Sequence, residues 1–271
     1  MNHCTVAALQ MTSGSDKSRN LATATGLVEE AAQRGAHFAA LPELFNCLGA
    51  PETIMAQAEP IPGPTSQAMS ELAARLKITL LAGSIAERAS SGGVFNSSLL
   101  FAPDGRQLSC YRKIHLFDID LPGRVTFMES KFLSPGDRIR VTETPIGRLG
   151  QAICYDLRFP ELFRCLVDRE AELFVVPAAF TMATGRDHWE ALVRARAIEN
   201  QAYVIAPNQF GRHTPSMNSY GRSLIVDPWG TVLATAPDGE AVITAVVQRT
   251  HQAEIRATLP AITHRRDLSE M

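Results

Sequence analysis

Residues 148–169, RLGQAICYDLRFPELFRCLVDR, pass from an apolar segment through a short polar stretch into a second apolar segment. The first part is typical of a buried strand. The second part has the spacing of a short helix, with Pro160 near its first turn, where proline is favoured. Cys154 lies where the strand gives way to the helix. A strand followed directly by a helix is the repeating unit of α/β proteins, so this segment predicts an α/β fold.

Strand-like and helix-like segments alternate on both sides of this unit. Residues 16–34 place Leu27 and Val28 on one helical face, and Gly35 follows where a helix end favours glycine. Asp104–Gly105 separates two strand-like runs and predicts a hairpin, so we expect mixed sheets. The expected strands cover residues 4–11, 37–45, 78–85, 94–103, 106–117, 148–156, 172–180, 202–209, 223–236 (a hairpin) and 240–247, and the expected helices cover residues 16–34, 64–77, 159–169 and 188–201. A short helix and a polar tail are expected after residue 247.

Residues 118–138 have no clean period and contain two prolines and two glycines, which predicts a long functional loop. No linker, low-complexity stretch or repeat divides the chain. We therefore expect residues 1–271 to form a single α/β domain.

The composition excludes several classes of protein. Hydrophobic residues make up 45% of the chain, charged residues 20%, and the net charge is −2, which does not favour nucleic-acid binding. No apolar run is long enough to span a membrane, and the first residues lack the pattern of a signal peptide. The five cysteines have no metal-like spacing, so free thiols in a reducing cytoplasm are expected. Neither a GxGxxG nor a P-loop motif is present, so no nucleotide cofactor is expected.

Three expected strands end in polar residues that carry chemistry. Cys154 precedes a turn into a helix, where free backbone N–H groups can stabilise a thiolate and an oxyanion. A small buried core residue is the alternative, and spacing alone leaves the two interpretations about even. Glu43 in LPEL and Lys113 in YRKIHLF end two other strands. Each is individually compatible with an ordinary surface charge.

Two further places are weighed in the same way. Glu129 lies in the expected loop beside Phe127, Met128 and Phe132, so that loop has to pack on something, although a glutamate in a loop is usually at the surface. His188 and Trp189 open an expected helix, where capping and packing are the favoured roles.

Together, these segments resemble the nitrilase superfamily of carbon–nitrogen hydrolases over nearly the whole chain. The matching segments occur in the family's order: LPEL, YRKIHLFD, FMESKFLSPGD, GQAICYDLRFPEL, HWEALVRARAIENQ and SYGRSLIVDPWG. The resemblance implies an α-β-β-α sandwich without a cofactor or metal. It also implies a homodimer or higher homo-oligomer, paired through the helices after Cys154 and around Arg194–Asn200, with the tail from about 250–271 touching the partner.

The resemblance also implies the catalytic residues. The family's Glu–Lys–Cys triad falls on Glu43, Lys113 and Cys154, and its second glutamate falls on Glu129. Cys154 is then the nucleophile, Glu43 the general base and acid, and Lys113 an oxyanion stabiliser together with the Tyr155 N–H. Glu129 is expected to position Lys113, or the water and substrate.

Within the family, the chain resembles small amidases that act on α-keto acid amides. One branch, the omega-amidases, hydrolyses α-ketoglutaramate and α-ketosuccinamate. The other cleaves deaminated glutathione to 2-oxoglutarate and cysteinylglycine, and residues 208–230, with the short stretch between Phe45 and Pro62, favour it. Arg124, Arg158 and Tyr155 are candidates for binding the substrate carboxylate. An ion pair with Asp156 or Glu161 is an equally good role for Arg158.

Other classes remain open at this stage. The same thioester chemistry serves acyltransferases, and a true nitrilase is a further alternative within the superfamily. A catalytically silent scaffold is a third class, against which the four intact catalytic positions argue.

Overall fold

Two β-sheets form the centre of the molecule in a computed structural model, which describes residues 3–123 and 125–266. The first sheet has the strand order β17-β1-β2-β3-β5-β4, with β6 paired to β5, and the second has the order β16-β15-β12-β11-β10-β9. The first comprises β1 (His3–Gln10), β2 (Phe38–Ala40), β3 (Thr79–Leu81), β4 (Ile85–Arg88), β5 (Val94–Phe101), β6 (Gln107–Arg112) and β17 (Ala241–Gln248). The second comprises β9 (Val141–Thr144), β10 (Gly147–Gln151), β11 (Leu173–Val175), β12 (Tyr203–Ala206), β15 (Leu224–Val226) and β16 (Val232–Thr235).

The two sheets pack face to face, and the alternation of β1 shows how. Val6 and Ala8 belong to a core cluster that also contains Val175 and Ile205 of the second sheet. Their neighbour Leu9 belongs to a different cluster on the other side of the first sheet. Successive side chains of a strand point to opposite faces, so the first sheet is buried on both sides.

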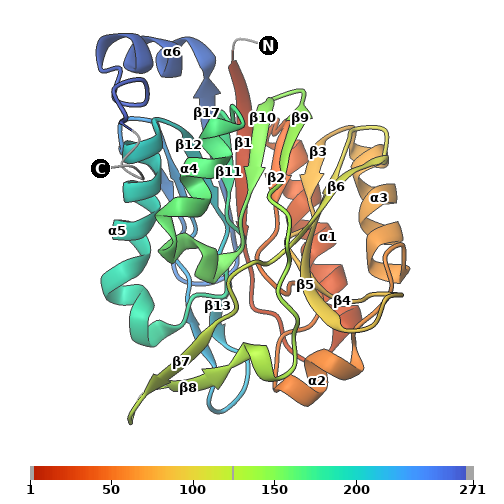
Figure 1. Ribbon diagram of the computed structural model, residues 1–271. Coiled ribbons are helices and arrows are strands. Elements are labelled where there is room, and N and C mark those ends of the chain that lie inside the picture. Colours follow the sequence, from red (N-terminus) through yellow and green to blue (C-terminus); the bar gives the residue numbers. More distant parts are fainter. Residues whose placement is uncertain (1–2, 124, 267–271) are drawn as a thin grey trace.

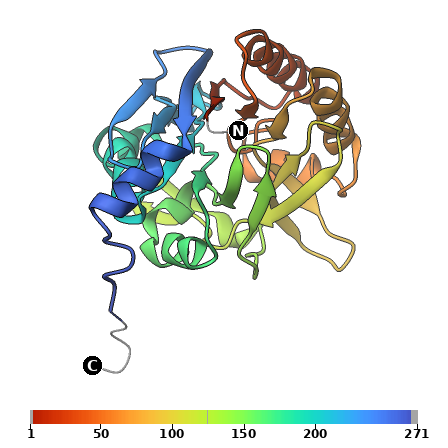
Figure 2. The ribbon, with the colours of Figure 1, turned by 90° about the horizontal axis from the view of Figure 1, so that it is seen from above.

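Helices cover the two outer faces, which completes an α-β-β-α sandwich (Figures 1 and 2). On the first sheet lie α1 (Lys17–Gln33) and α3 (Pro64–Leu76), and their apolar side chains share its outer core cluster. On the second lie α4 (Pro160–Asp168) and α5 (Met182–Asn200). Asp16 caps α1 by accepting a hydrogen bond from the Arg19 N–H. The mixed sheets and the layered fold confirm the predicted class.

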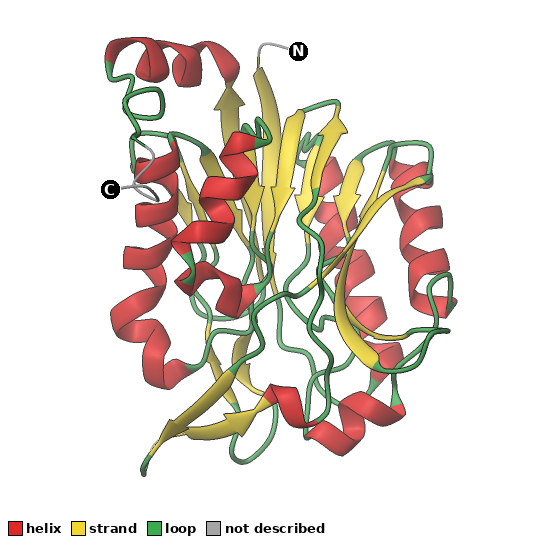
Figure 3. Cartoon of the chain, viewed as in Figure 1, coloured by secondary structure: helices red, strands yellow, loops and turns green. Residues whose placement is uncertain are grey.

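The segment 118–138 is not the irregular loop that we expected. It forms a hairpin of β7 (Asp118–Leu121) and β8 (Val125–Met128), followed by the short helix η1 (Glu129–Lys131). The hairpin extends from the body at the lower end of the molecule (Figure 3). A Pro122–Gly123 turn, with Gly123 at φ 71°, joins its strands. The prolines and glycines predicted a long functional loop here, whereas Pro122 and Gly123 form the turn of a hairpin.

Several other boundaries also differ from the expected ones. Helix α5 begins at Met182, more than one turn before His188. The sequence did not indicate this added turn because it contains Thr184 and Gly185, which are weak helix formers. A short helix α2 (Pro51–Ala56) and a small hairpin of β13 (Phe210–Arg212) and β14 (Asn218–Tyr220) lie in stretches without an expected element.

The chain's last described segment follows β17. Helix α6 (Arg249–Thr258) leads to residues 259–266, and the rest of the tail expected to touch a partner, 267–271, is outside the described residues. Across 3–123 and 125–266, no helix has both the length and the apolar character needed to cross a membrane.

Candidate active site

Cys154 begins the short helix η2 (Cys154–Arg158) and has a positive φ of 45°. Residues other than glycine rarely adopt this conformation, and such strain often marks a functional position. The turn is held by hydrogen bonds from the Cys154 N–H to the Pro177 carbonyl (2.9 Å) and from the Asp156 N–H to the Ile153 carbonyl (3.0 Å). Within this turn, the Tyr155 N–H donates to no backbone carbonyl. The side chain of Cys154 is buried, as the core interpretation required, but its neighbours are polar.

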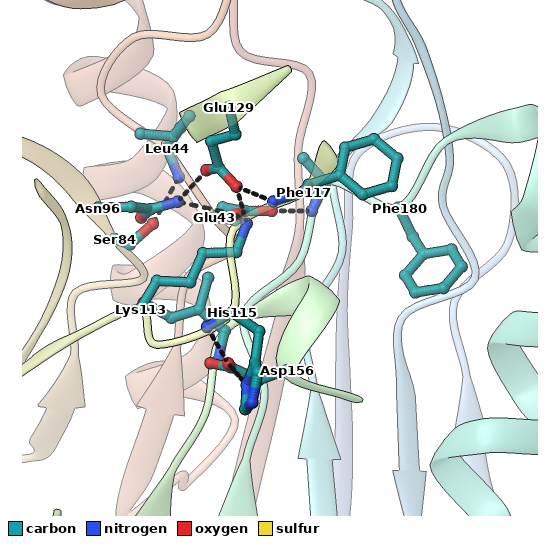
Figure 4. Close-up of polar contacts among 12 residues, drawn as sticks. Glu43, Leu44, Ser84, Asn96, Lys113, His115, Phe117, Glu129, Asp156 and Phe180 are labelled. Carbon is teal, nitrogen blue, oxygen red and sulfur yellow. Dashed lines mark hydrogen bonds and ion pairs between the residues drawn. The ribbon is translucent and has the colours of Figure 1, made fainter. Parts of the chain in front are cut away.

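Lys113 lies between two carboxylates (Figure 4), and its charge acts on the Cys154 thiol, which lines the same cavity. Its Nζ is 2.9 Å from Glu43 Oε1 and 2.8 Å from Glu129 Oε2. Glu43 follows β2, Lys113 follows β6 and Glu129 begins η1, so three separate segments meet. All three side chains are at most 5% exposed. The structure therefore brings Glu43, Lys113, Glu129 and Cys154 together, and none is a surface charge.

Fixed donors hold both carboxylates. The Ala179 N–H donates to Glu43 Oε2 at 2.8 Å, and the Phe117 N–H donates to Glu129 Oε2 at 2.6 Å. Asn96 Nδ2 donates to Glu43 Oε1 at 2.8 Å and lies 3.4 Å from Glu129 Oε1. Each carboxylate is thus oriented by the backbone and by one shared amide.

The sequence interpretation missed Asn96. It lies in β5, where VFNSSLLF carries polar side chains within an otherwise apolar strand, and Asn96 is fully buried. A buried polar side chain needs partners, so an asparagine in a central strand was the available signal.

The electrostatics of the cluster set the charge of each group. Burial raises the pKa of the Cys154 thiol well above its ordinary value, the negative charge of Glu43 raises it further, and the charge of Lys113 only partly opposes them. Burial disfavours a charged Lys113, but Glu129 and Glu43 outweigh it and raise the pKa of the ammonium well above its usual value. Burial also raises the pKa of Glu129, although Lys113 counteracts it. The resting site holds a neutral thiol beside a charged lysine.

A cavity of about 820 Å³ opens onto these four residues. Phe117, Phe127 of β8, Phe180 from the segment between β11 and α5, and Met217 from the β13–β14 loop contribute apolar wall. A concave, mostly apolar pocket with convergent polar groups at one end is the usual form of a small-molecule site.

Arg158 lines the same cavity and is not paired with Asp156 or Glu161. Its Nη1 lies 3.3 Å from His188 Nδ1, and its guanidinium lies 5.0 Å from the centre of the Phe180 ring. No carboxylate pairs with it within residues 3–123 and 125–266. Tyr155 also lines the cavity, whereas Arg124 lies outside the described residues. Trp189 is buried in the core, so the expected packing role fits it. His188 instead contacts Arg158.

Within the described part of the chain, no group of three or more histidine, cysteine, aspartate or glutamate side chains is placed to hold a metal ion. The four candidate residues instead combine a thiol, a base and an ammonium, which suits acyl transfer.

Residues 5–257 match the family model of carbon–nitrogen hydrolases. The chain belongs to this family. The human omega-amidase NIT2 is 42% identical over 96% of this chain and 94% of its own length, and the Xenopus laevis omega-amidase NIT2-B is 45% identical over 93% and 91%. These relatives also support the omega-amidase branch of the nitrilase superfamily.

Solved structures agree with the sequence relatives. The Caenorhabditis elegans NitFhit protein superposes with a TM-score of 0.90 at 38% identity, over 98% of this chain and 66% of that longer one. Saccharomyces cerevisiae Nit3, a member of branch 10 of the nitrilase superfamily, gives a TM-score of 0.89 at 32% identity, over 98% and 97%. This protein is therefore an enzyme that acts on carbon–nitrogen bonds other than peptide bonds. It is an amidase, as the sequence predicted.

Proposed function

We propose that this amidase is an omega-amidase that hydrolyses the terminal amide of a small α-keto dicarboxylic acid monoamide, such as α-ketoglutaramate. The observation that carries the proposal is the Lys113 ammonium held between Glu43 and Glu129 beside Cys154, at the end of the cavity. The relatives named omega-amidase support the substrate class.

Acylation begins with the neutral thiol. Glu43 takes the proton of Cys154 as the sulfur attacks the amide carbon, because the raised pKa of the thiol leaves little free thiolate at rest. The Lys113 ammonium and the Tyr155 N–H stabilise the oxyanion that forms. One such donor typically contributes about 3–4 kcal/mol to the transition state.

The same groups complete acylation and then carry out deacylation. Glu43 first gives its proton to the leaving nitrogen, so ammonia departs and a thioester remains on Cys154. Glu43 then takes a proton from water as it attacks the thioester, and returns the proton to the Cys154 sulfur as the carbon–sulfur bond breaks and the acid departs. The Ala179 N–H keeps Glu43 oriented through both steps, since it binds the oxygen that Lys113 does not.

Glu129 positions the lysine. Its Oε2 accepts hydrogen bonds from Lys113 Nζ and the Phe117 N–H, so the ammonium has one carboxylate partner that does not take part in proton transfer. When Glu43 becomes protonated, Glu129 still keeps Lys113 charged. The raised pKa of Lys113 supports this role.

Arg158 is the proposed partner of the substrate's α-keto carboxylate. It lines the cavity near the thiol, lacks a carboxylate partner among the described residues and is held against Phe180. A guanidinium can bind a carboxylate through two parallel hydrogen bonds. Tyr155 lies 5.8 Å below the same guanidinium and contributes to this subsite.

A second candidate substrate is deaminated glutathione, which the sequence of residues 208–230 favoured. Ser216, Met217 and Asn218 from that segment line the cavity, so the segment is placed to contact a leaving group larger than ammonia. The relatives named above are omega-amidases, however, so deaminated glutathione stays a prediction and takes second place.

Steady-state kinetics on both substrates decide between them. We expect a higher kcat/KM for α-ketoglutaramate, with ammonia as the product, and no activity in Cys154→Ala. A higher kcat/KM for deaminated glutathione would reverse the choice.

Two further assays test other reaction classes. Adding hydroxylamine separates hydrolysis from acyl transfer, because a transferase forms hydroxamate in preference to acid. A nitrile substrate tests for nitrilase activity.

We also propose that the protein is a cytoplasmic homodimer or larger homo-oligomer. Ile198 on α5 and Trp229 near the β15–β16 turn are 50% and 59% exposed, and a Cβ on Gly230 would touch Ile198, so these apolar groups are neighbours. Light scattering on the wild type and Trp229→Ser tests this. The expected result is a dimer that the substitution weakens, and a wild-type monomer would contradict it.

A further inference from the structure

Asp156 is a fully buried carboxylate close to Cys154 that has no part in the reaction proposed above. Its Oδ2 accepts hydrogen bonds from the Tyr111 hydroxyl at 2.7 Å and the Ile153 N–H at 2.9 Å. Its Oδ1 accepts from the His115 N–H at 3.0 Å and is 2.7 Å from His115 Nδ1. Asp156 and His115 lie directly below Lys113 in Figure 4.

The donors belong to the two segments that carry the nucleophile and the lysine. Ile153 immediately precedes Cys154, and His115 is two residues after Lys113. Asp156 therefore ties the strained turn of the thiol to the loop of the ammonium.

We propose that Asp156 is a positioning residue, which fixes the Cys154 thiol relative to the Lys113 ammonium by clamping both segments. The inference rests on the proposed roles of Cys154 and Lys113. It assigns to Asp156 a function that neither the triad nor the second glutamate supplies.

The chemistry of the donors suits a rigid clamp. An ionised carboxylate only accepts hydrogen bonds, so Tyr111 has to donate and His115 has to carry a proton on Nδ1. Hydrogen bonds to a charged acceptor are stronger than those between neutral groups. The His115 ring also stacks on Phe159, with centroids 3.7 Å apart and an interplanar angle of 7°. The Phe159 ring in turn packs against the Tyr155 ring, with the two ring centroids 5.4 Å apart, so the clamp extends to the cavity wall.

An asparagine at position 156 would retain the size of the side chain and lose the clamp. Its NH₂ group would face the Ile153 N–H or the His115 N–H, and two donors cannot bond to each other. A displacement of reacting groups by about 1 Å can lower a rate about 10²-fold. We therefore expect Asp156→Asn to lower kcat about 10²-fold and to change KM much less, because Arg158 and the cavity wall still bind the substrate.

A purely structural role predicts a different pattern. Under that role the folded fraction of Asp156→Asn would have normal kcat, and only the unfolding temperature would fall. Tyr203→Phe is the matched control, because it removes the hydrogen bonds of the buried Tyr203 hydroxyl with Gln248 in the core between the sheets. It is expected to lower the unfolding temperature while kcat stays within about 2-fold of wild type.

His115→Phe tests the clamp if Asp156→Asn does not fold. The His115 side chain is 28% exposed, and phenylalanine can retain the stacking on Phe159 while it removes the Nδ1 bond. One of two ties to the lysine loop is then lost, and the expected fall in kcat is about 10-fold. Normal kcat in folded Asp156→Asn or, if that variant does not fold, in His115→Phe overturns the inference.

The outcome is separable from that of the proposed function. Active Cys154→Ala refutes the reaction itself. If Cys154→Ala is inactive while folded Asp156→Asn turns over normally, the reaction stands and only the clamp is refuted. Alkylation of Cys154 by iodoacetamide, followed on its own peptide by mass spectrometry, needs no substrate and should change in rate in Asp156→Asn but not in Tyr203→Phe.

Discussion

Lys113 Nζ lies 2.9 Å from Glu43 Oε1, although the two residues are 70 positions apart in the chain. Glu129 takes a second hydrogen bond from the same nitrogen. With the three groups ionised, the cluster carries one net negative charge in a buried place, which disfavours a thiolate on Cys154. In the proposed reaction the thiol therefore loses its proton as it attacks, and Glu43 is the carboxylate proposed to receive it.

Replacing the nucleophile should remove catalysis without unfolding the protein. Cys154→Ala and Cys154→Ser are expected to lower amide turnover by at least about 10³-fold, because neither side chain supplies a thiol. Circular dichroism and thermal unfolding should resemble those of the wild type. Cys165→Ser, at an exposed cysteine, is the control and should keep full activity. Near-normal hydrolysis by purified Cys154→Ala contradicts the mechanism.

Replacing the ammonium should impair acylation. Lys113→Met retains the length and apolar stem of the side chain but leaves Glu43 and Glu129 facing each other in a buried site. We expect a fall in the acylation rate of at least about 10²-fold, the usual effect of losing an oxyanion donor, and a lower unfolding temperature. Stopped-flow measurement of product release in a single turnover checks the rate.

The matched control for this substitution is Lys131→Met, at an exposed lysine in η1. Its activity should stay within about 2-fold of wild type, as expected of a surface substitution. If Lys113→Met forms acyl-enzyme at the wild-type rate, the lysine has no role in stabilising the oxyanion.

The pH dependence of thiol alkylation reports the charge around Cys154. Burial and Glu43 raise the pKa of the thiol, so alkylation by iodoacetamide should rise at a higher pH than for a free cysteine. Glu43→Gln removes the negative charge while Lys113 remains, which lowers the pKa of the thiol. This variant should be alkylated faster at neutral pH and yet hydrolyse no amide. An alkylation midpoint that stays in place would show that Glu43 does not act on the thiol.

The sequence predicted the elements that follow simple periodicity, namely the alternating strands, the helices α1, α3 and α4, and the Asp104–Gly105 hairpin. It also located the four clustered residues, because their motifs have a characteristic order. The hairpin of β7 and β8 was missed because its alternation is short, and the Pro122–Gly123 turn suggested a loop. Asn96 was not assigned a role, and Asp156 was considered only as an ion-pair partner of Arg158, because the hydrogen-bond partners of both side chains include residues far away in the chain.

Acid should weaken the protein partly through Glu87. Burial alone would raise the pKa of this carboxyl, but hydrogen bonds from Arg112 and Ser97 outweigh burial and lower it. A lowered folded-state pKa means that the stabilisation is complete above the unfolded value of about 4.3 and is lost as the pH falls through the folded value. The stability difference between wild type and Glu87→Gln should therefore be largest near neutrality and shrink below about pH 4.3. Urea unfolding across this range measures it.

The control for that experiment is Glu71→Gln, at an exposed glutamate of α3. Its stability should differ from wild type by less than about 0.5 kcal/mol at every pH. A constant difference for Glu87→Gln from neutral to acidic pH would show that its pairing with Arg112 does not stabilise the fold.

Two helical glycines should respond to alanine in opposite directions. A Cβ on Gly185, in the first turns of α5, would collide with the Tyr220 side chain of β14, whereas a Cβ on the exposed Gly26 of α1 meets no atom within 4 Å. Gly26→Ala should raise the free energy of unfolding by about 0.5–1 kcal/mol, because alanine favours the helix. Gly185→Ala should lower it by about 1–3 kcal/mol, since the overpacking destabilises the fold more than alanine's helix propensity stabilises it.

The same two substitutions should differ in their effect on KM. Because β14 also carries Asn218 at the cavity wall, KM should rise in Gly185→Ala and stay unchanged in Gly26→Ala. Equal gains in stability from both substitutions would show that α5 and β14 are not in close contact.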